Sequence, residues 1–227
     1  MLPPFRAVIL DLDGLLLDTE PTYRRAWRQT AAELGFDFTE DLARRLEGQS
    51  IDAVARILSD AFGPGFDFET FHRLSARRWH QWVEAHGIPV KPGYGRLMEV
   101  LRRRRIPYLL ATNSQRRYAV KCLTLAGIAA DFPVIVSRDD VTAGKPEPEI
   151  YLRACETLAL PPAQCLAVED SLPGILAAHR AGTQPVLVTD GNLDRHGDAL
   201  ENRLVARYPS LERLADCLDR TITRYLR

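Results

Sequence analysis

The sequence predicts an α/β fold, in which a three-layer core around a parallel sheet carries an inserted all-helical domain. Through most of the chain, short apolar runs bounded by turn residues alternate with single helical patterns. This alternation is typical of parallel sheets that are covered by helices on both faces. The length of 227 residues is about one and a half times a typical domain, which fits a core with an insertion.

Five buried strands are expected where short apolar runs are flanked by turn residues. Helical periodicity fills the intervals between the later runs, and Gly127 and Gly182 follow two of these patterns, as glycine often does at a helix C-terminus. The expected strands are 7–10, 108–111, 134–136, 166–168 and 185–188, and the expected core helices are 94–104, 116–125, 149–158 and 172–181.

The stretch 18–91 contains helical spacing and no convincing strand. Three helices are expected in it: one begins near Pro21 and ends at Gly35, one begins after Ser50, and one ends before Gly87. We therefore assign residues 1–17 and 92–227 to the α/β core and residues 18–91 to the inserted helical domain.

The charge balance argues against several classes of partner. Thirty Lys and Arg residues balance thirty Asp and Glu residues, so a broad basic surface for nucleic acid or anionic membrane is not expected. The basic run 102–105 falls at the end of a predicted helix, where the helix dipole favours cations.

No apolar run is long enough to span a bilayer, and the four cysteines form no Cys-x-x-Cys pair. We expect a cytoplasmic protein that is a monomer or a weak homodimer.

Four polar groups follow strand-like runs, and parallel strands present such groups at one edge of the sheet. Other interpretations of two of them fail. A calcium loop of the EF-hand type places its glycine sixth, whereas Gly14 is fourth after Asp11, and a P-loop would need Gly and Ser or Thr where Asp139 and Pro146 stand. The groups are Asp11-Leu12-Asp13-Gly14, Thr112-Asn113-Ser114, Gly144-Lys145-Pro146 and Glu169-Asp170.

The combined charge of these groups predicts a metal site. Asp11, Asp13, Glu169 and Asp170 would converge with Lys145 as the only nearby cation in the sequence motifs. At about 4 Å and an effective dielectric constant of about 20, each like-charge pair costs about 4 kcal/mol. A hard divalent cation relieves this repulsion, and ligands that are all oxygen atoms favour Mg²⁺.

In their order along the chain, the four groups resemble the motifs of the haloacid dehalogenase-like (HAD) hydrolases. The strings DLDGLLLDTE, GKPEPEIY and VEDSLPGI resemble the subgroup that contains β-phosphoglucomutase and small sugar- or nucleotide-phosphate phosphatases. The resemblance covers essentially the whole chain. It implies a Rossmann-like core and makes the helical insertion a cap domain that closes over the site.

The resemblance also implies a role for each core residue. Asp11 would be the nucleophile that forms an aspartyl-phosphate, and Asp13 would protonate the leaving oxygen and then activate water. Thr112 and the backbone of Asn113 would bind phosphoryl oxygens, whereas Lys145 would neutralise charge on these oxygens and on Asp11.

By the same resemblance, Mg²⁺ would be held by Asp11, the main-chain carbonyl of Asp13 and Asp170, with Glu169 behind them or acting through water. Dehalogenases of the superfamily lack the second aspartate, so Asp13 favours phosphoryl transfer. The expected function is a magnesium-dependent phosphatase of a small phosphorylated metabolite: a sugar phosphate, a phosphoglycolate-like compound or a nucleoside monophosphate.

A phosphosugar mutase is the alternative. The β-phosphoglucomutase subgroup uses a histidine in the first cap helix and an arginine further along the cap, where this chain has Tyr23 and Ile51. Both departures favour hydrolysis. A non-catalytic binding protein on the same scaffold is a remote third possibility, because such proteins usually lose a core residue and none is missing here.

Substrate choice is expected to lie in the cap. Arg78 is a candidate to meet a second anionic group, and Thr19, Tyr23 and Gln49 are further candidates.

Overall fold

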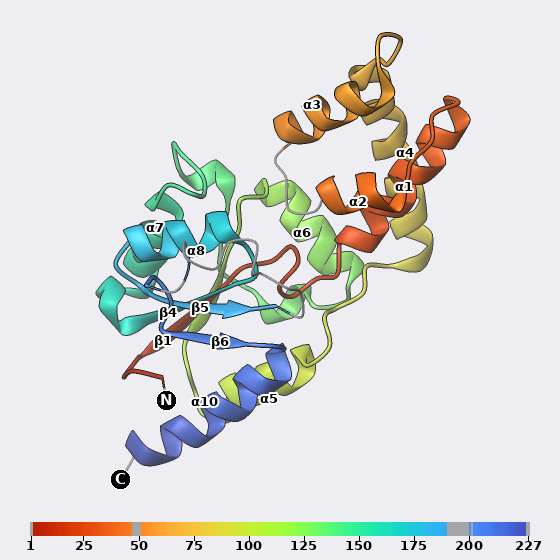
Figure 1. The fold of residues 1–227 in the computed structure, drawn as a ribbon. Coiled ribbons are helices and arrows are strands. Elements are labelled where there is room, and N and C mark those ends of the chain that lie inside the picture. Colours follow the sequence, from red (N-terminus) through yellow and green to blue (C-terminus); the bar gives the residue numbers. More distant parts are fainter. Residues whose placement is uncertain (1, 47–50, 190–199, 201, 226–227) are drawn as a thin grey trace. The chain divides into compact units, whose positions relative to one another are not determined.

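A computed structural model describes residues 2–46, 51–189, 200 and 202–225. The chain separates into two compact units (Figure 1). Residues 1–17 and 89–227 form the first unit, and residues 18–88 form the second.

The first unit is built on a six-stranded sheet in which all neighbouring strands are parallel. The strand order is β3-β2-β1-β4-β5-β6, so the direction of winding reverses between β1 and β4. This observation confirms the predicted α/β class. The strands are β1 (Ala7–Leu10), β2 (Tyr108–Ala111), β3 (Ile135–Val136), β4 (Cys165–Glu169), β5 (Gln184–Val188) and β6 (Ala206–Tyr208).

Helices cover both faces of this sheet (Figure 1). Ala7 and Ile9 of β1 pack in one buried cluster with residues of α7 (Glu149–Leu158) and α8 (Leu172–Arg180). Val8 and Leu10 alternate with them and are fully buried toward the opposite face, where α5 (Tyr94–Arg103) packs against α10 (Leu211–Tyr225). The remaining core elements are α6 (Arg116–Leu125) and the short 3-10 helices η1 (Ala129–Asp131), η2 (Arg138–Asp140) and η3 (Pro162–Gln164).

Apart from the short 3-10 helices, two of these core elements are absent from the sequence-based expectation. The strand β6 has only three residues, and none of them is fully buried, so it lacks the apolar run that marks the other strands. The helix α10 is strongly amphipathic, but it lies beyond the last strand that the sequence signalled.

The second unit is helical, as expected, but it has one more helix than the three predicted. Its described elements are α1 (Glu20–Glu33), α2 (Glu40–Leu46), α3 (Ile51–Phe62) and α4 (Phe68–His86). The additional helix α2 has seven residues, which is too short for a clear periodic signal. A cluster of buried apolar residues that includes Leu42, Leu58 and Phe71 forms the core of this unit.

The second boundary between the units falls three residues before the expected end at residue 91. Pro89 begins the returning segment of the first unit. Val90 forms an antiparallel bridge with Leu17, and the Lys91 N–H donates to the Leu16 carbonyl at 2.8 Å. These backbone contacts hold the returning segment beside the segment that leaves β1.

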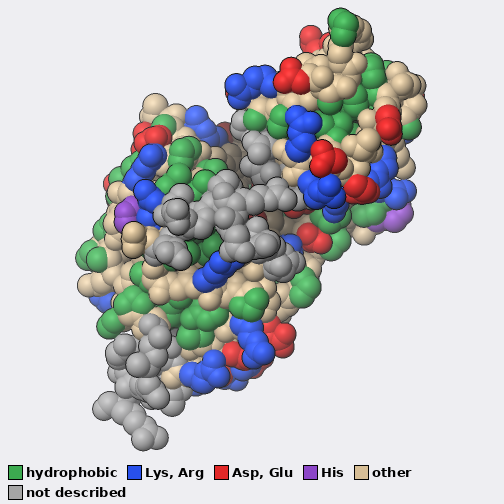
Figure 2. Space-filling model, viewed as in Figure 1, with side chains coloured by type: hydrophobic (Ala, Val, Ile, Leu, Met, Phe, Trp, Pro, Cys, Tyr) green, Lys and Arg blue, Asp and Glu red, His purple; other side chains and the backbone are tan. Residues whose placement is uncertain are grey.

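The basic run at the end of α5 is paired with acidic side chains. Arg102 forms an ion pair with Asp131, and Arg103 and Arg104 both pair with Asp219 of α10. Figure 2 shows blue and red side chains together over α5 and α10. These ion pairs fit the expectation of a charged helix end. Among the described residues, no helix has the length and hydrophobicity needed to cross a membrane.

A capping box stabilises the exit from β3, which leads toward Lys145. Asp140 accepts hydrogen bonds from the Ser137 N–H and hydroxyl, both at 2.7 Å, and from the Arg116 guanidinium at 2.6 Å. Burial opposes the charge, but these donors lower the pKa of Asp140 from its usual 3.8 to about 2. The turn after β3 is thereby joined to the first residue of α6.

We predict that Asp140→Asn lowers the free energy of unfolding by about 1–2 kcal/mol at pH 7, because the substitution removes a carboxylate whose charged form is stabilised in the folded state. Since the folded pKa is depressed, the contribution is present above about pH 4 and is lost as the pH falls toward 2. Urea denaturation at several pH values measures the difference.

The control is Asp41→Asn, which removes a carboxylate with 72% of its side chain exposed and an ion pair to Arg44. This control should leave stability nearly unchanged. Equal effects of the two substitutions, or a gap that does not shrink on acidification, would contradict the role given to Asp140.

Candidate active site

Asp11 lies at the centre of the sheet edge, because it follows β1, which is flanked by β2 and β4. Its N–H donates to the Val168 carbonyl of β4 at 3.1 Å. On the other side, Thr112 follows β2, and its N–H donates to the Val136 carbonyl at 2.9 Å. The strand ends therefore bring side chains that are distant in sequence to the point where the sheet reverses its winding, which is where open parallel sheets bind ligands.

Lys145 reaches this point from the loop after η2. Its ammonium contacts Asp11 Oδ1, donates to Glu169 Oε1 at 2.5 Å and donates to the Ala111 carbonyl at 3.0 Å. Only 4% of the Lys145 side chain is exposed, and the side chains of Asp11 and Glu169 are 10% and 0% exposed. The ammonium therefore bridges the ends of β1, β2 and β4 in a largely desolvated environment.

Asn113 fixes the backbone that carries this lysine. The Lys145 N–H donates to Asn113 Oδ1 at 2.7 Å, and Asn113 Nδ2 donates to the Lys145 carbonyl at 3.1 Å. A Cβ on Gly144 would lie 2.4 Å from Asn113 Oδ1, so the glycine allows this close approach. The side chain of Asn113 thus binds the Lys145 loop, and only its main chain is left to serve the expected phosphoryl contact.

Glu169, the last residue of β4, is fully buried and surrounded by donors. Its Oε1 accepts from the Tyr151 hydroxyl as well as from Lys145, and its Oε2 accepts from the Ser171 hydroxyl at 3.1 Å. The Lys145 ammonium also lies 5.3 Å from the centre of the Tyr151 ring. A Cβ on Gly174 would lie about 2 Å from the Glu169 carboxylate, so α8 can pass here only with glycine at that position.

Burial and charge oppose one another in this cluster. Burial raises the pKa of Asp11 to about 8, although the neighbouring Lys145 ammonium lowers it. Burial also acts against the charge of Lys145, but attraction to Asp11 and Glu169 raises the pKa of its ammonium above the usual value. The positive charge of the single ammonium does not fully neutralise the negative charge of the carboxylates around it.

Three carboxylates could together hold a metal ion. Asp11, Glu169 and Asp170 each offer an oxygen within 4.8 Å of the others. Gly14 has a φ of +85°, and a Cβ there would lie 2.0 Å from Asp170 Oδ2, so glycine lets the loop after β1 approach this carboxylate. The donor set contains hard oxygen atoms and an excess of negative charge, which fits Mg²⁺.

The carboxylate of Asp13 does not belong to this group of three. Ser114 donates its hydroxyl to Asp13 Oδ2 at 2.7 Å, and Tyr118 donates its hydroxyl to Oδ1 at 3.2 Å. The metal ligand expected from Asp13 is its main-chain carbonyl, which these two hydrogen bonds do not involve. Thr112 is almost fully buried, and its hydroxyl oxygen accepts from the Ser114 N–H at 3.0 Å, which shapes the turn after β2.

The expected substrate-binding residues of the helical unit lie in or next to α1 and α4. Thr19 is buried before α1, and its carbonyl accepts from the Thr22 hydroxyl at 2.5 Å. Tyr23 stacks on Trp79 with ring centres 4.9 Å apart. Trp79 is 2% exposed and donates to Thr22, so it packs between α1 and α4.

Arg78 forms an ion pair with Glu33 within this unit. A second anionic group of a substrate would therefore compete with a carboxylate already bound to this arginine. Gln49 lies outside the described residues. Ile51 begins α3, and half of its surface is exposed.

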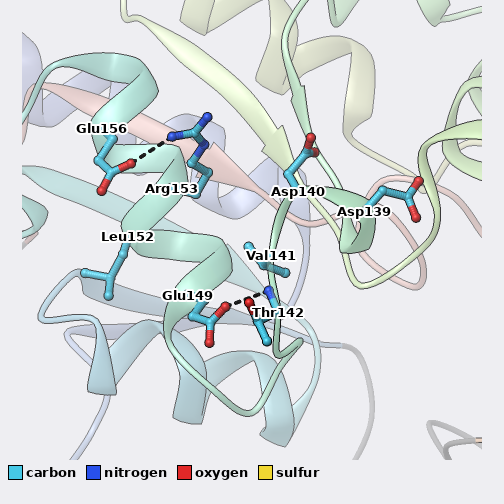
Figure 3. A pocket seen from close by; sticks show the side chains of 8 residues that line it. All are labelled: Asp139, Asp140, Val141, Thr142, Glu149, Leu152, Arg153 and Glu156. Carbon is cyan, nitrogen blue, oxygen red and sulfur yellow. Dashed lines mark hydrogen bonds and ion pairs between the residues drawn. The ribbon is translucent and has the colours of Figure 1, made fainter.

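A pocket between η2 and α7 contains none of the expected site residues (Figure 3). Glu149 accepts from the N–H groups of Thr142 and Ala143 at 2.8 and 3.1 Å, and Arg153 pairs with Glu156. The carboxylates that line this pocket outnumber its one arginine. The resulting negative charge disfavours binding of a phosphate ester. The full lining is Asp139, Asp140, Val141, Thr142, Glu149, Leu152, Arg153 and Glu156.

Sequence reasoning assigned no role to Tyr118 or Tyr151. Tyr151 is buried and Tyr118 is half-buried, and each lies on a helix whose apolar spacing is typical of ordinary packing. The sequence therefore gives no sign that either hydroxyl binds a carboxylate. Ser114 and Ser171 stand inside the recognised motifs, but their hydroxyls carried no separate signal.

Comparison with known proteins places these observations in a family context. Residues 5–182 match the family model described as haloacid dehalogenase-like hydrolase. A phosphorylated carbohydrates phosphatase of Thermotoga maritima is 36% identical over 180 residues, which are 79% of this chain and 83% of that protein. A β-phosphoglucomutase of Bacillus subtilis is 34% identical over 194 residues, which are 82% and 84% of the two chains.

A solved structure shows the same architecture. The crystal structure of CbbY from Rhodobacter sphaeroides in complex with phosphate matches with a TM-score of 0.71 and 29% identity. The match covers 92% of this chain and 96% of that chain.

We predict that Gly174→Ala lowers the free energy of unfolding by about 1–3 kcal/mol or more, because the new methyl group would overlap the buried Glu169 carboxylate. The matched control is Gly95→Ala in α5, where the added Cβ meets nothing within 4 Å. This control should leave stability unchanged or raise it by up to about 1 kcal/mol. Urea denaturation of both variants tests the difference, and equal stability would contradict the packing of α8 against Glu169.

Proposed function

The chain belongs to the haloacid dehalogenase-like hydrolase family, and on that premise we propose that it is a magnesium-dependent phosphatase of small phosphorylated sugars, with Asp11 as the nucleophile. The observation that carries this proposal is the contact between the buried Lys145 ammonium and Asp11 beside a cluster of three carboxylates. Such a site offers a carboxylate oxygen for attack and positive charge for the phosphoryl group.

In the first step, Asp11 attacks the phosphorus atom of the ester. Lys145 holds Asp11 Oδ1, which orients the carboxylate and leaves its other oxygen for the new O–P bond. The bond from phosphorus to the sugar oxygen breaks, and Asp13 gives its proton to that leaving oxygen. The products of this step are the free alcohol and an aspartyl-phosphate on Asp11.

In the second step, water attacks the phosphorus atom of the aspartyl-phosphate. The carboxylate of Asp13, now without its proton, accepts one from the attacking water. The bond between Asp11 and phosphorus breaks, which releases inorganic phosphate and restores both aspartates. Thr112, the main chain of Asn113 and Lys145 would stabilise the negative charge on the phosphoryl oxygens in both steps.

The metal site of this proposal contains Asp11, Asp170 and the main-chain carbonyl of Asp13, with Glu169 behind them. Both Glu169 oxygens already accept hydrogen bonds, which supports a contact through water for this residue. When bound, Mg²⁺ would neutralise negative charge on the carboxylates and on the phosphoryl group.

Phosphorylated sugars are favoured as substrates because two relatives, 36% and 34% identical, are named for phosphorylated carbohydrates or for phosphoglucose. We propose that the helical unit, residues 18–88, acts as the cap that selects among them. Its candidate contacts remain Thr19, Tyr23, Gln49 and Arg78.

A phosphosugar mutase is the second candidate function, because one relative is a β-phosphoglucomutase. Hydrolysis is preferred because Tyr23 and Ile51 occupy the positions at which that subgroup uses histidine and arginine. Tyr23 stacks on Trp79, so a packed phenol ring stands where that subgroup has its histidine.

We predict that the purified protein releases inorganic phosphate from one or more sugar phosphates in the presence of Mg²⁺, because the site combines a nucleophile with a proton donor. A panel of hexose and pentose phosphates, phosphoglycolate and nucleoside monophosphates, read by phosphate release, identifies the substrate class. Asp11→Asn should reduce turnover at least about a thousandfold without lowering thermal stability, since the nucleophile is lost.

Excess EDTA should abolish the activity, and added Mg²⁺ should restore it. Retained turnover in Asp11→Asn would remove Asp11 as nucleophile, and indifference to EDTA would remove the metal. With β-glucose 1-phosphate, the expected product is free phosphate. Formation of glucose 6-phosphate would instead identify a mutase.

A further inference from the structure

Two hydroxyl groups from one short segment hold both oxygens of the Asp13 carboxylate. Ser114, in the loop that leaves β2, donates to Oδ2 at 2.7 Å. Tyr118, four residues later in the first turn of α6, donates to Oδ1 at 3.2 Å. All three residues belong to the first unit, so these contacts are made by the α/β core alone.

This segment is itself fixed at several points. The Ser114 N–H donates to Thr112 Oγ1, and the Ser114 carbonyl accepts from the Arg138 N–H, each at 3.0 Å. Two residues further on, the Arg116 N–H donates to Asp139 Oδ2 at 2.8 Å. The backbone that carries the Ser114 and Tyr118 hydroxyls is therefore hydrogen-bonded to the end of β2 and to η2.

Contacts to both oxygens restrict the rotation of a carboxyl group. A hydrogen bond to one oxygen leaves the group free to turn about its last side-chain bond, whereas bonds to Oδ1 and Oδ2 fix the plane. Each carboxylate oxygen has two acceptor sites, so both oxygens can still reach a leaving group or a water molecule. Small errors in the placement of a catalytic group can cost about a hundredfold in rate.

We propose that Ser114 and Tyr118 are positioning residues that hold Asp13 in the orientation from which it exchanges protons with the leaving oxygen and with water. The inference rests on the proposed phosphatase function. Neither residue needs to touch the phosphoryl group, because both act through Asp13. Asp13 transfers one proton to the leaving oxygen and recovers one from water, while both hydroxyls keep their own protons.

The dependence on the leaving group separates this role from a general structural role. A sugar alkoxide is a poor leaving group and needs the proton from Asp13, whereas 2,4-dinitrophenolate leaves without one. The ratio kcat/KM reports the steps up to cleavage of the ester bond. Mispositioning of the acid should therefore lower kcat/KM for a sugar phosphate much more than for 2,4-dinitrophenyl phosphate.

The experiment compares Ser114→Ala, Tyr118→Phe and the double variant with the wild-type protein on these two substrates, the sugar phosphate being the best one from the panel. We expect kcat/KM of the double variant to fall about 10- to 100-fold for the sugar phosphate and no more than about threefold for 2,4-dinitrophenyl phosphate. Ser114→Thr keeps a hydroxyl and should recover most of the loss seen in Ser114→Ala.

The matched control is Tyr94→Phe, which removes another tyrosine hydroxyl bound to a carboxylate, that of Asp131 at 2.5 Å, in the same unit. It should leave the ratio of the two kcat/KM values unchanged. Asp13→Asn should show the same selectivity as the double variant, with a larger loss on the sugar phosphate.

Equal losses on both substrates, or no loss, would overturn the positioning role. A gain on the sugar phosphate would also overturn it, because the hydroxyls would then hold Asp13 away from the leaving oxygen. If Asp13→Asn shows the expected selective loss on the sugar phosphate but the hydroxyl variants do not, only this inference fails. If the wild-type protein hydrolyses neither substrate, the proposed function fails with it.

Discussion

The site depends on one buried ion pair cluster, in which the Lys145 ammonium is enclosed by Asp11, Glu169 and the Ala111 carbonyl. A charged group that is removed from water is stable only when its partners replace the lost hydration. Three strand ends therefore have to meet at this ammonium. The strand order meets that requirement because it places β1, which leads to Asp11, between β2 and β4.

The surrounding residues are arranged to keep this cluster in place. Asn113 binds the Lys145 main chain from one side, whereas Tyr151 and Ser171 bind Glu169 from the other. Glycine is needed where the packing is closest, as at Gly174. Asp11 and Glu169 thus lie among hydrogen bonds and close packing that hold them in place, and this is the arrangement that the proposed catalysis requires.

Much of the fold, and the convergence of polar groups at one edge of the sheet, could be predicted from the sequence for a simple reason. Buried strands are marked by apolar runs, and polar residues directly after such runs have to meet at one sheet edge, as Asp11, Thr112 and Glu169 do. The weak or short elements β6 and α2 lacked this contrast and were missed. The bonds of Tyr118, Tyr151 and Asn113 were also unpredictable, because they depend on tertiary distances that no local pattern encodes.

Above all, we propose that Asp11, held by Lys145, becomes covalently phosphorylated during turnover. Rapid quenching of the enzyme with its sugar phosphate, followed by reduction with borohydride, converts an aspartyl-phosphate to homoserine, which tandem mass spectrometry can locate. We expect homoserine at position 11 only when substrate was present. Its absence there in an enzyme that turns over, or its appearance at position 13 instead, would contradict the account.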